Sequence, residues 1–189
     1  MSDLSELVGG GGGGAMELIS SVSMSGASTV DFTSLPLGTY DNFFILCTGV
    51  GNTVNSAALM ARMFKNGSLV TGSDYLVGMT VRSGTSSLSY QSSSPNALNL
   101  SAEGIPTDTK GTLQLWLTNM NDAEARNFNG YSHYYQAKGT NPGSATLNEK
   151  ATNLICGATG TGSFDGIRLY PEVSTFTSGQ ASLYGFKTS

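Results

Sequence analysis

The amino-acid sequence predicts an all-β fold, an antiparallel β-sandwich preceded by a short N-terminal arm. Three observations lead to this fold class. Apolar residues recur at every second position along many short segments, as in strands with one buried face. Gly, Asn, Ser and Pro separate these segments, and no window after the arm keeps a 3.6-residue apolar period for three turns. Short strands without intervening helices form antiparallel sheets, and among these folds the sequence favours a jelly roll.

The strands are expected along the whole domain. The stretch 40–47 is almost continuously apolar, which is typical of a central buried strand. The run 59–64 ends at Asn66-Gly67, a pair typical of a two-residue hairpin because both residues tolerate positive φ. In chain order, the expected strands are 16–24, 30–32, 40–47, 59–64, 75–81, 113–117, 128–135, 154–156, 164–170 and 181–186.

Two polar stretches interrupt this series. Residues 83–94 are rich in Ser and are interpreted as an exposed loop or a weak edge strand. Residues 137–148 have the same two interpretations, with Pro142-Gly143 as their turn. Neither stretch is expected to contribute to the core.

The composition agrees with a strand-and-turn protein and excludes several classes. The chain has 189 residues, with 26 Ser, 20 Thr and 25 Gly, and 39% of it is hydrophobic. Charged residues make up only 12%, and the net charge is −4. Because an acidic, charge-poor chain gains little from counterion release, no nucleic-acid binding is expected. The apolar content argues against disorder, and the apolar runs are too short for membrane insertion.

The chain length predicts one domain, a β-sandwich over residues 15–189, after an arm of residues 1–14. In the arm, Leu4, Leu7 and Val8 lie on one side of a short helical segment, and six glycines follow as a flexible linker. So short a helix needs a partner surface to bury its apolar side, which indicates an anchor. A frayed terminus is the alternative. No signal peptide is predicted, because no basic region precedes an apolar stretch.

No catalytic constellation emerges from the sequence. His133 is the single histidine, so any serine or cysteine nucleophile would depend on it as a base. Cys47 and Cys156 lie in apolar runs and are expected to be buried free thiols, with a disulfide as the alternative. One His and two distant Cys do not supply a zinc site, and the carboxylates are scattered. We therefore expect no enzyme, no cofactor and no metal site.

One expected strand carries a candidate binding surface. Tyr131, His133 and Tyr135 occupy alternate positions and so share one face of that strand. Each side chain joins an apolar ring to a polar group, a combination found where proteins contact sugars and where subunits meet. Three interpretations stay open for this segment. One face of the strand is core and the other a half-exposed sheet face without a partner, or the Tyr-His-Tyr face contacts another subunit, or it contacts a glycan.

Two segments near the ends of the domain, 29–50 and 163–189, carry distinct patterns. The first reads Phe-x-x-Leu, then Tyr-Asp, then an apolar strand, and the second reads Ile-Arg-Leu-Tyr, then Phe-x-Ser-Gly-x-x-x-Leu-Tyr-Gly. These positions are Phe32, Leu35, Tyr40 and Asp41, then 167–170, Phe176, Ser178, Gly179 and 183–185. Together they resemble a group of small tailed-bacteriophage virion proteins. The apolar peptide followed by glycines also resembles phage appendage and decoration proteins.

This resemblance implies a virion structural protein, either a tail-fibre-like appendage or a capsid-decoration (cement) subunit, with no catalytic residues. It implies a homotrimer. The arm would hold this trimer to another virion protein of the capsid, tail or baseplate after synthesis in the host cytoplasm. The alternative is a glycan-binding module of a tail fibre or spike, with the Tyr-His-Tyr face contacting the host surface. A β-sandwich hydrolase that uses His133 as its base is the third hypothesis.

Overall fold

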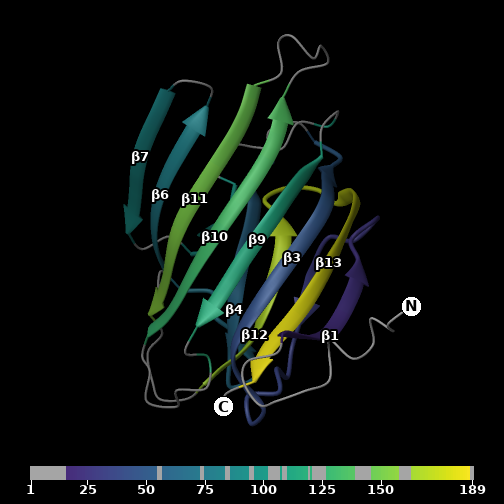
Figure 1. The fold of residues 1–189 in the computed structure, drawn as a ribbon, viewed down its shortest axis with the longest axis vertical. Helices are drawn as coiled ribbons and strands as arrows, with labels where there is room; N and C mark the ends of the chain where they lie inside the picture. The colour runs from purple at the N-terminus through teal and green to yellow at the C-terminus, as the bar shows by residue number, and fades with distance from the viewer. Residues whose placement is uncertain are drawn as a thin grey trace, which may run out of the picture.

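Two antiparallel sheets pack face to face, and the strands of the larger sheet lie in front of β4 and β12 in Figure 1. For several of these strands, including all of β10 and β11, the structure describes the backbone alone. This computed structural model describes residues 16–54, 57–72, 75–83, 86–93, 96–101, 107, 110–118, 120, 127–138, 146–157 and 163–187.

The larger sheet has eight strands in the order β1-β13-β3-β9-β10-β11-β6-β7, and every neighbouring pair is antiparallel. Strands β1 and β7 form its two edges. The bounds are β1 Met16–Ser23, β13 Phe176–Lys187, β3 Tyr40–Asn52, β9 Gly111–Thr118, β10 Asn127–Lys138, β11 Thr146–Gly157, β6 Tyr75–Ser83 and β7 Ser86–Ser93.

The smaller sheet has the order β2-β12-β4-β5, and β8 pairs with β4 outside this path. Its strands also pair in antiparallel fashion. The bounds are β2 Val30–Phe32, β12 Phe164–Pro171, β4 Leu59–Lys65, β5 Ser68–Leu69 and β8 Leu98–Asn99.

The predicted all-β antiparallel sandwich is confirmed, and the described residues contain no helix. The jelly roll remains a prediction. The Ser-rich stretch 83–94 contains β7, so the edge-strand interpretation was correct there. In the second polar stretch, β10 continues to Lys138 and β11 begins at Thr146, whereas residues 139–145 lie outside the described residues. Within the described part of the chain, no helix is long and apolar enough to span a membrane.

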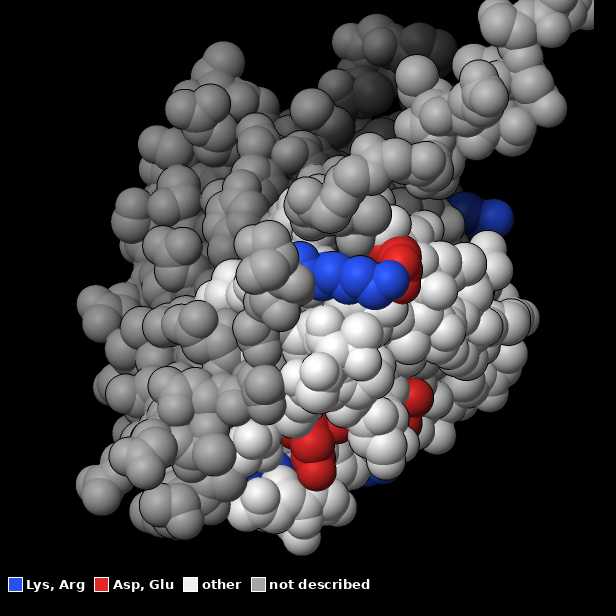
Figure 2. Space-filling model, turned by 60° about the horizontal axis from the view of Figure 1, so that its bottom comes forward, with Lys and Arg blue, Asp and Glu red and all other residues white. Residues whose placement is uncertain are grey.

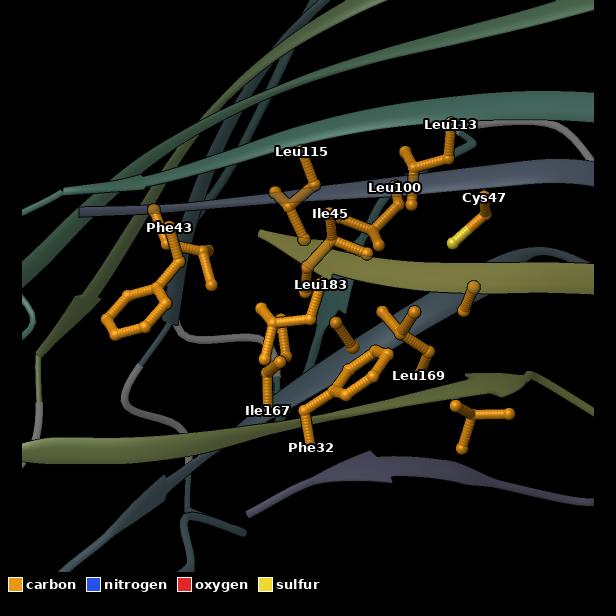
Figure 3. Close-up of a cluster of buried hydrophobic side chains, with 14 of the residues drawn as sticks. Phe32, Phe43, Ile45, Cys47, Leu100, Leu113, Leu115, Ile167, Leu169 and Leu183 are labelled. Carbon is orange, nitrogen blue, oxygen red and sulfur yellow. The ribbon is translucent and has the colours of Figure 1, made fainter. Parts of the chain in front are cut away.

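The core lies between the two sheets and is almost entirely apolar. In β9, Leu113, Leu115 and Leu117 are fully buried, which is the period of two that the sequence predicts. From the smaller sheet, Ile167 and Leu169 point toward the same layer (Figure 3). Burial of these side chains supplies most of the free energy that holds the sheets together.

The hairpin predicted at Asn66-Gly67 joins β4 to β5. Both residues have positive φ, 51° and 72°, and the flanking residues Lys65 and Ser68 pair directly. The Gly67 N–H donates to Oδ2 of Asp165 at 2.6 Å, which ties the turn to β12. The turn therefore forms for the reason given by the sequence, that both of its central residues tolerate a left-handed backbone.

Candidate functional site: the outer face of the eight-stranded sheet

The residues predicted to anchor the arm, Leu4, Leu7 and Val8, lie outside the described residues. The Tyr-His-Tyr positions are described at the level of the backbone. They lie on β10, near the middle of the larger sheet, between β9 and β11. The register pairs Tyr131 with Trp116 and Asn153, His133 with Gln114 and Ala151, and Tyr135 with Thr112 and Glu149.

These positions belong to the outer face of the sheet. In β9 the leucines point into the core, so the alternate residues, among them Gln114 and Trp116, lie on the side away from the core. Directly paired residues of neighbouring antiparallel strands share a face. The register therefore brings the positions of Tyr131, His133 and Tyr135 to the outer face.

Four aromatic side chains gather on this face, next to the β10 positions. We call Phe44 of β3, Trp116 of β9 and Tyr184 and Phe186 of β13 the outer aromatic cluster. The ring centroids of Phe44 and Trp116 lie 4.5 Å apart, those of Phe44 and Tyr184 lie 6.0 Å apart, and Trp116 stacks on Phe186 at 5.3 Å. Such distances fall in the range where aromatic pairs attract each other beyond simple area burial.

Exposed apolar side chains of β1 extend the cluster to the sheet edge. Met16 pairs with Phe186, and Leu18 pairs with Tyr184. Leu18 is 59% exposed, Met16 is 50% exposed and Trp116 is 37% exposed. Outward positions of an antiparallel sheet are usually polar, so this apolar band needs an explanation beyond the fold itself.

A polar patch lies beside the band, farther along the same strands. The hydroxyls of Ser21 and Ser182 are 2.9 Å apart, and the Gln180 side-chain amide donates to the Ser21 hydroxyl at 2.9 Å. The band is thus bounded on this side by hydrogen-bonded polar groups. A hydrophobic patch rimmed by polar residues is the usual anatomy of an interaction surface.

A charged cluster lies at the same edge of the sheet, on the side of β1 opposite to Met16 and Leu18. The Glu17 carboxylate accepts hydrogen bonds from Nζ of Lys187 and from the hydroxyl of Tyr40, both at 2.5 Å. These two contacts, Lys187 first, lower the pKa of Glu17, and the same carboxylate raises the pKa of Lys187 and of Tyr40. Lys187 and Glu17 neutralise each other, so the edge adds no net charge to the band.

The structure describes the side chain of one of the two cysteines that could act as a nucleophile. Cys47 is a free, fully buried thiol, and burial raises its pKa to about 12, so it is a core residue and no nucleophile. The free thiol predicted for Cys47 is confirmed. No group of three or more His, Cys, Asp or Glu in the described part of the chain could hold a metal ion.

Sequence reasoning missed the outer aromatic cluster. One signal was available, because Trp116 alternates with the three leucines of β9 and must therefore face away from them. The other members come from β3 and β13, and only the strand order shows that these strands flank one another. Comparisons with protein-family models, with curated proteins and with solved structures find no match for this chain.

Proposed function

We propose that the chain is a structural protein of a tailed-bacteriophage virion, an appendage or capsid-decoration subunit that forms a homotrimer and does not act as an enzyme. The observation that carries the proposal is the packing of the two segments that resemble such proteins. Although they lie near opposite ends of the domain, 29–50 and 163–189 fold together, with β2 on β12 and β3 on β13. The resemblance therefore falls on one structural unit that contributes to both sheets.

Residues of the shared pattern contact one another within this unit. Phe32 pairs directly with Ile167, and both side chains are buried. Gly185 lies against the ring of Tyr40, where a Cβ would come within 2.5 Å of the ring carbon Cγ. Gly179 has a φ of 129°, a conformation that other residues rarely adopt. Packing and backbone conformation thus require these residues at these positions. This supports our interpretation that the pattern is shared by a family of proteins with the same fold.

The role that we propose is mechanical. Leu4, Leu7 and Val8 bury against a neighbouring protein of the capsid, tail or baseplate, and the glycine run gives the arm its reach. Met16 is the first residue of β1, and β1 is an edge strand of the larger sheet. The domain therefore begins at a sheet edge, which supports an anchor in the residues before Met16. Since virion proteins occur in many copies, a weak individual anchor is sufficient.

The test compares the full chain with a chain that lacks residues 1–14. The full chain should give a light-scattering mass three times its 19.6 kDa, and the truncated chain should give three times its own, smaller mass. Quantitative mass spectrometry of purified particles should detect the full chain and lose the truncated one. Incorporation of the truncated chain at normal copy number would contradict the anchor, and absence of the full chain from particles would contradict the proposed function.

A second candidate function is glycan binding by a tail fibre or spike. It is favoured by the register that sets Tyr131 beside Trp116 and His133 beside Gln114, because rings and amides together suit sugars. A glycan array should then show binding by the wild type that Tyr131→Ala abolishes. Tyr170→Ala, on β12 of the smaller sheet, is the matched control. Binding that is equal in all three proteins would contradict this site.

A further inference from the structure

We propose that copies of this chain associate through the outer face of the larger sheet, with the outer aromatic cluster at the centre of the contact. The inference rests on the homotrimer of the proposed function and names the surface that forms it. Its starting point is a side-by-side row of residues, each the direct partner of the next. The row runs Leu18, Tyr184, Phe44, Trp116 and Tyr131, from β1 to β10.

The row makes the apolar band continuous. Side chains of directly paired residues lie about 5 Å apart, so no polar residue separates Leu18 from Tyr184 or Phe44 from Trp116. Met16 and Phe186 form a second, shorter pair at the same edge. The band therefore crosses at least four neighbouring strands and ends in Leu18, the most exposed large apolar side chain among the described residues.

The rings of the band are already ordered before any partner arrives. Trp116 contacts both Phe44 and Phe186, which hold the indole in one orientation. An anchor that is fixed in advance loses little side-chain entropy when it is buried, and Trp is the residue type most enriched among the strong contacts of interfaces. Trp116 is thus the natural centre of the contact.

Charge points to a second copy as the occupant. The described outward positions of β13, of β9 and of β3 from Asn42 to Thr48 carry no Asp, Glu, Lys or Arg; they are Gln180, Ser182, Tyr184 and Phe186, then Asn42, Phe44, Leu46 and Thr48, then Thr112, Gln114, Trp116 and Thr118. Another copy brings the same neutral face, so no like charges are opposed. A basic or acidic partner would find no complementary charge at these outward positions.

The smaller sheet carries several charged side chains. On the smaller sheet, Arg168 forms a bidentate pair with Asp31 at 2.6 and 2.7 Å, and Arg62 lies over the ring of Tyr170. Among the described residues on the side shown in Figure 2, a basic side chain lies beside an acidic one. The outward positions of β13, of β9 and of β3 from Asn42 to Thr48 thus offer a more neutral surface than the smaller sheet.

The size of the face is also sufficient. Over β1, β13, β3, β9 and β10 it measures about 20 Å by 30 Å, or roughly 600 Å² in projection, from the usual spacings of strands and residues. Protruding side chains raise the accessible area further, and specific interfaces bury about 800 Å² per partner. If the strands run parallel to a threefold axis, the residues of one register row lie at the same height along the axis in all three copies. The aromatic rows of the three copies then contact one another.

Two charge-introducing variants test the surface by light scattering. Leu18→Lys and Trp116→Lys should lower the mass from that of a trimer to that of a monomer, with association at least about thirtyfold weaker, as for a central contact residue. The matched control is Val173→Lys, since Val173 is 51% exposed but lies in the loop between β12 and β13. It should remain a trimer. Circular dichroism shows that each variant is folded.

Trp116 also gives a test that needs no variant, because it is the only tryptophan of the chain. Diluting the wild-type trimer until it dissociates should shift the emission to longer wavelength as the indole becomes exposed. Dissociation without a shift, or folded trimers of both lysine variants, would overturn the interface and leave the homotrimer standing. A wild type that is monomeric throughout contradicts the homotrimer itself. A shift caused by added oligosaccharides in an undissociated trimer assigns the band to a glycan and overturns the interface.

Discussion

Gly185 shows how one residue limits what the sandwich can accommodate. It lies on β13, and a Cβ there would come within 2.5 Å of the Tyr40 ring and 2.9 Å of the Ile19 side chain. Gly185→Ala should therefore lower the free energy of unfolding by about 1–3 kcal/mol, the usual cost of overpacking. Urea denaturation followed by circular dichroism measures the change.

Gly38 is the matched control for this substitution. A Cβ at Gly38 meets nothing within 4 Å, and its backbone is not in the left-handed region. Gly38→Ala should leave the free energy of unfolding unchanged within about 0.5 kcal/mol or raise it slightly. Equal losses in the two variants would mean that close approach to Tyr40 does not explain the glycine.

Cys47 should be protected from alkylation as long as the chain is folded. Burial raises the pKa of its thiol to about 12, and the reactive thiolate is scarce at pH 8. Iodoacetamide should therefore label Cys47 at least about a hundredfold more slowly in the folded chain than in urea. Peptide mass spectrometry assigns the label to Cys47 without a need to replace the other cysteine. Rapid labelling of the folded chain would contradict the core position.

Ionisation of the Cys47 thiol makes the free energy of unfolding depend on pH in the alkaline range. Its folded pKa lies above the unfolded value, so its contribution is complete below about pH 9 and is lost as pH rises toward 12. In this window the unfolded chain has released the proton that the folded chain keeps, so the free energy of unfolding falls. Cys47→Ala should remove this part of the decline, which urea denaturation at several pH values measures.

At the scale of elements, the β4–β5 hairpin depends on the backbone of its turn. Gly67 has a φ of 72°, yet a Cβ there would meet nothing within 4 Å. Gly67→Ala should therefore cost only backbone strain, about 1–2 kcal/mol, in contrast to the steric cost at Gly185. Urea denaturation beside Gly38→Ala measures it. If Gly67→Ala is as stable as wild type, the turn is not fixed by its left-handed residue.

The strands that the sequence predicts well are those with an unbroken period of two. From Leu113 to Leu117 in β9, every second residue is a buried leucine. The turn at Asn66-Gly67 is also predicted well, because it depends only on the positive φ that these two residues tolerate. The first half of β13 was missed, because its register shifts between Phe176 and Ser178 and again before Gln180, which breaks the alternation. Strands of two residues, such as β5, are too short to show any period.

The outer aromatic cluster escaped prediction for a different reason. Trp116 and Phe44 are far apart in the sequence, and their contact depends on β3 and β9 being neighbours. Local patterns assign a residue to a face of its own strand, but they do not reveal which strand comes next. The Tyr-His-Tyr positions were found because all three lie on one strand, β10.

For the whole molecule, the contrast between the two sheets predicts how salt acts on self-association. The described outward positions of β13, of β9 and of β3 from Asn42 to Thr48 are uncharged, whereas Arg62, Arg168 and Asp31 lie on the smaller sheet. An apolar contact is not screened by salt, so raising NaCl from about 0.05 M to about 1 M should change the association constant less than about threefold. Sodium sulfate should strengthen association, because excluded salts favour apolar burial.

Light scattering over a dilution series measures this dependence, and Trp116 emission reports the same equilibrium from within the band. A contact through the smaller sheet would behave in the opposite way, because Arg168 and Asp31 would exchange partners across it and NaCl would weaken it tenfold or more. Light scattering and Trp116 emission together also show whether a contact outside the band holds the trimer. If salt dissociates the trimer without a shift in Trp116 emission, a charged contact elsewhere holds the copies together and the band is not the interface.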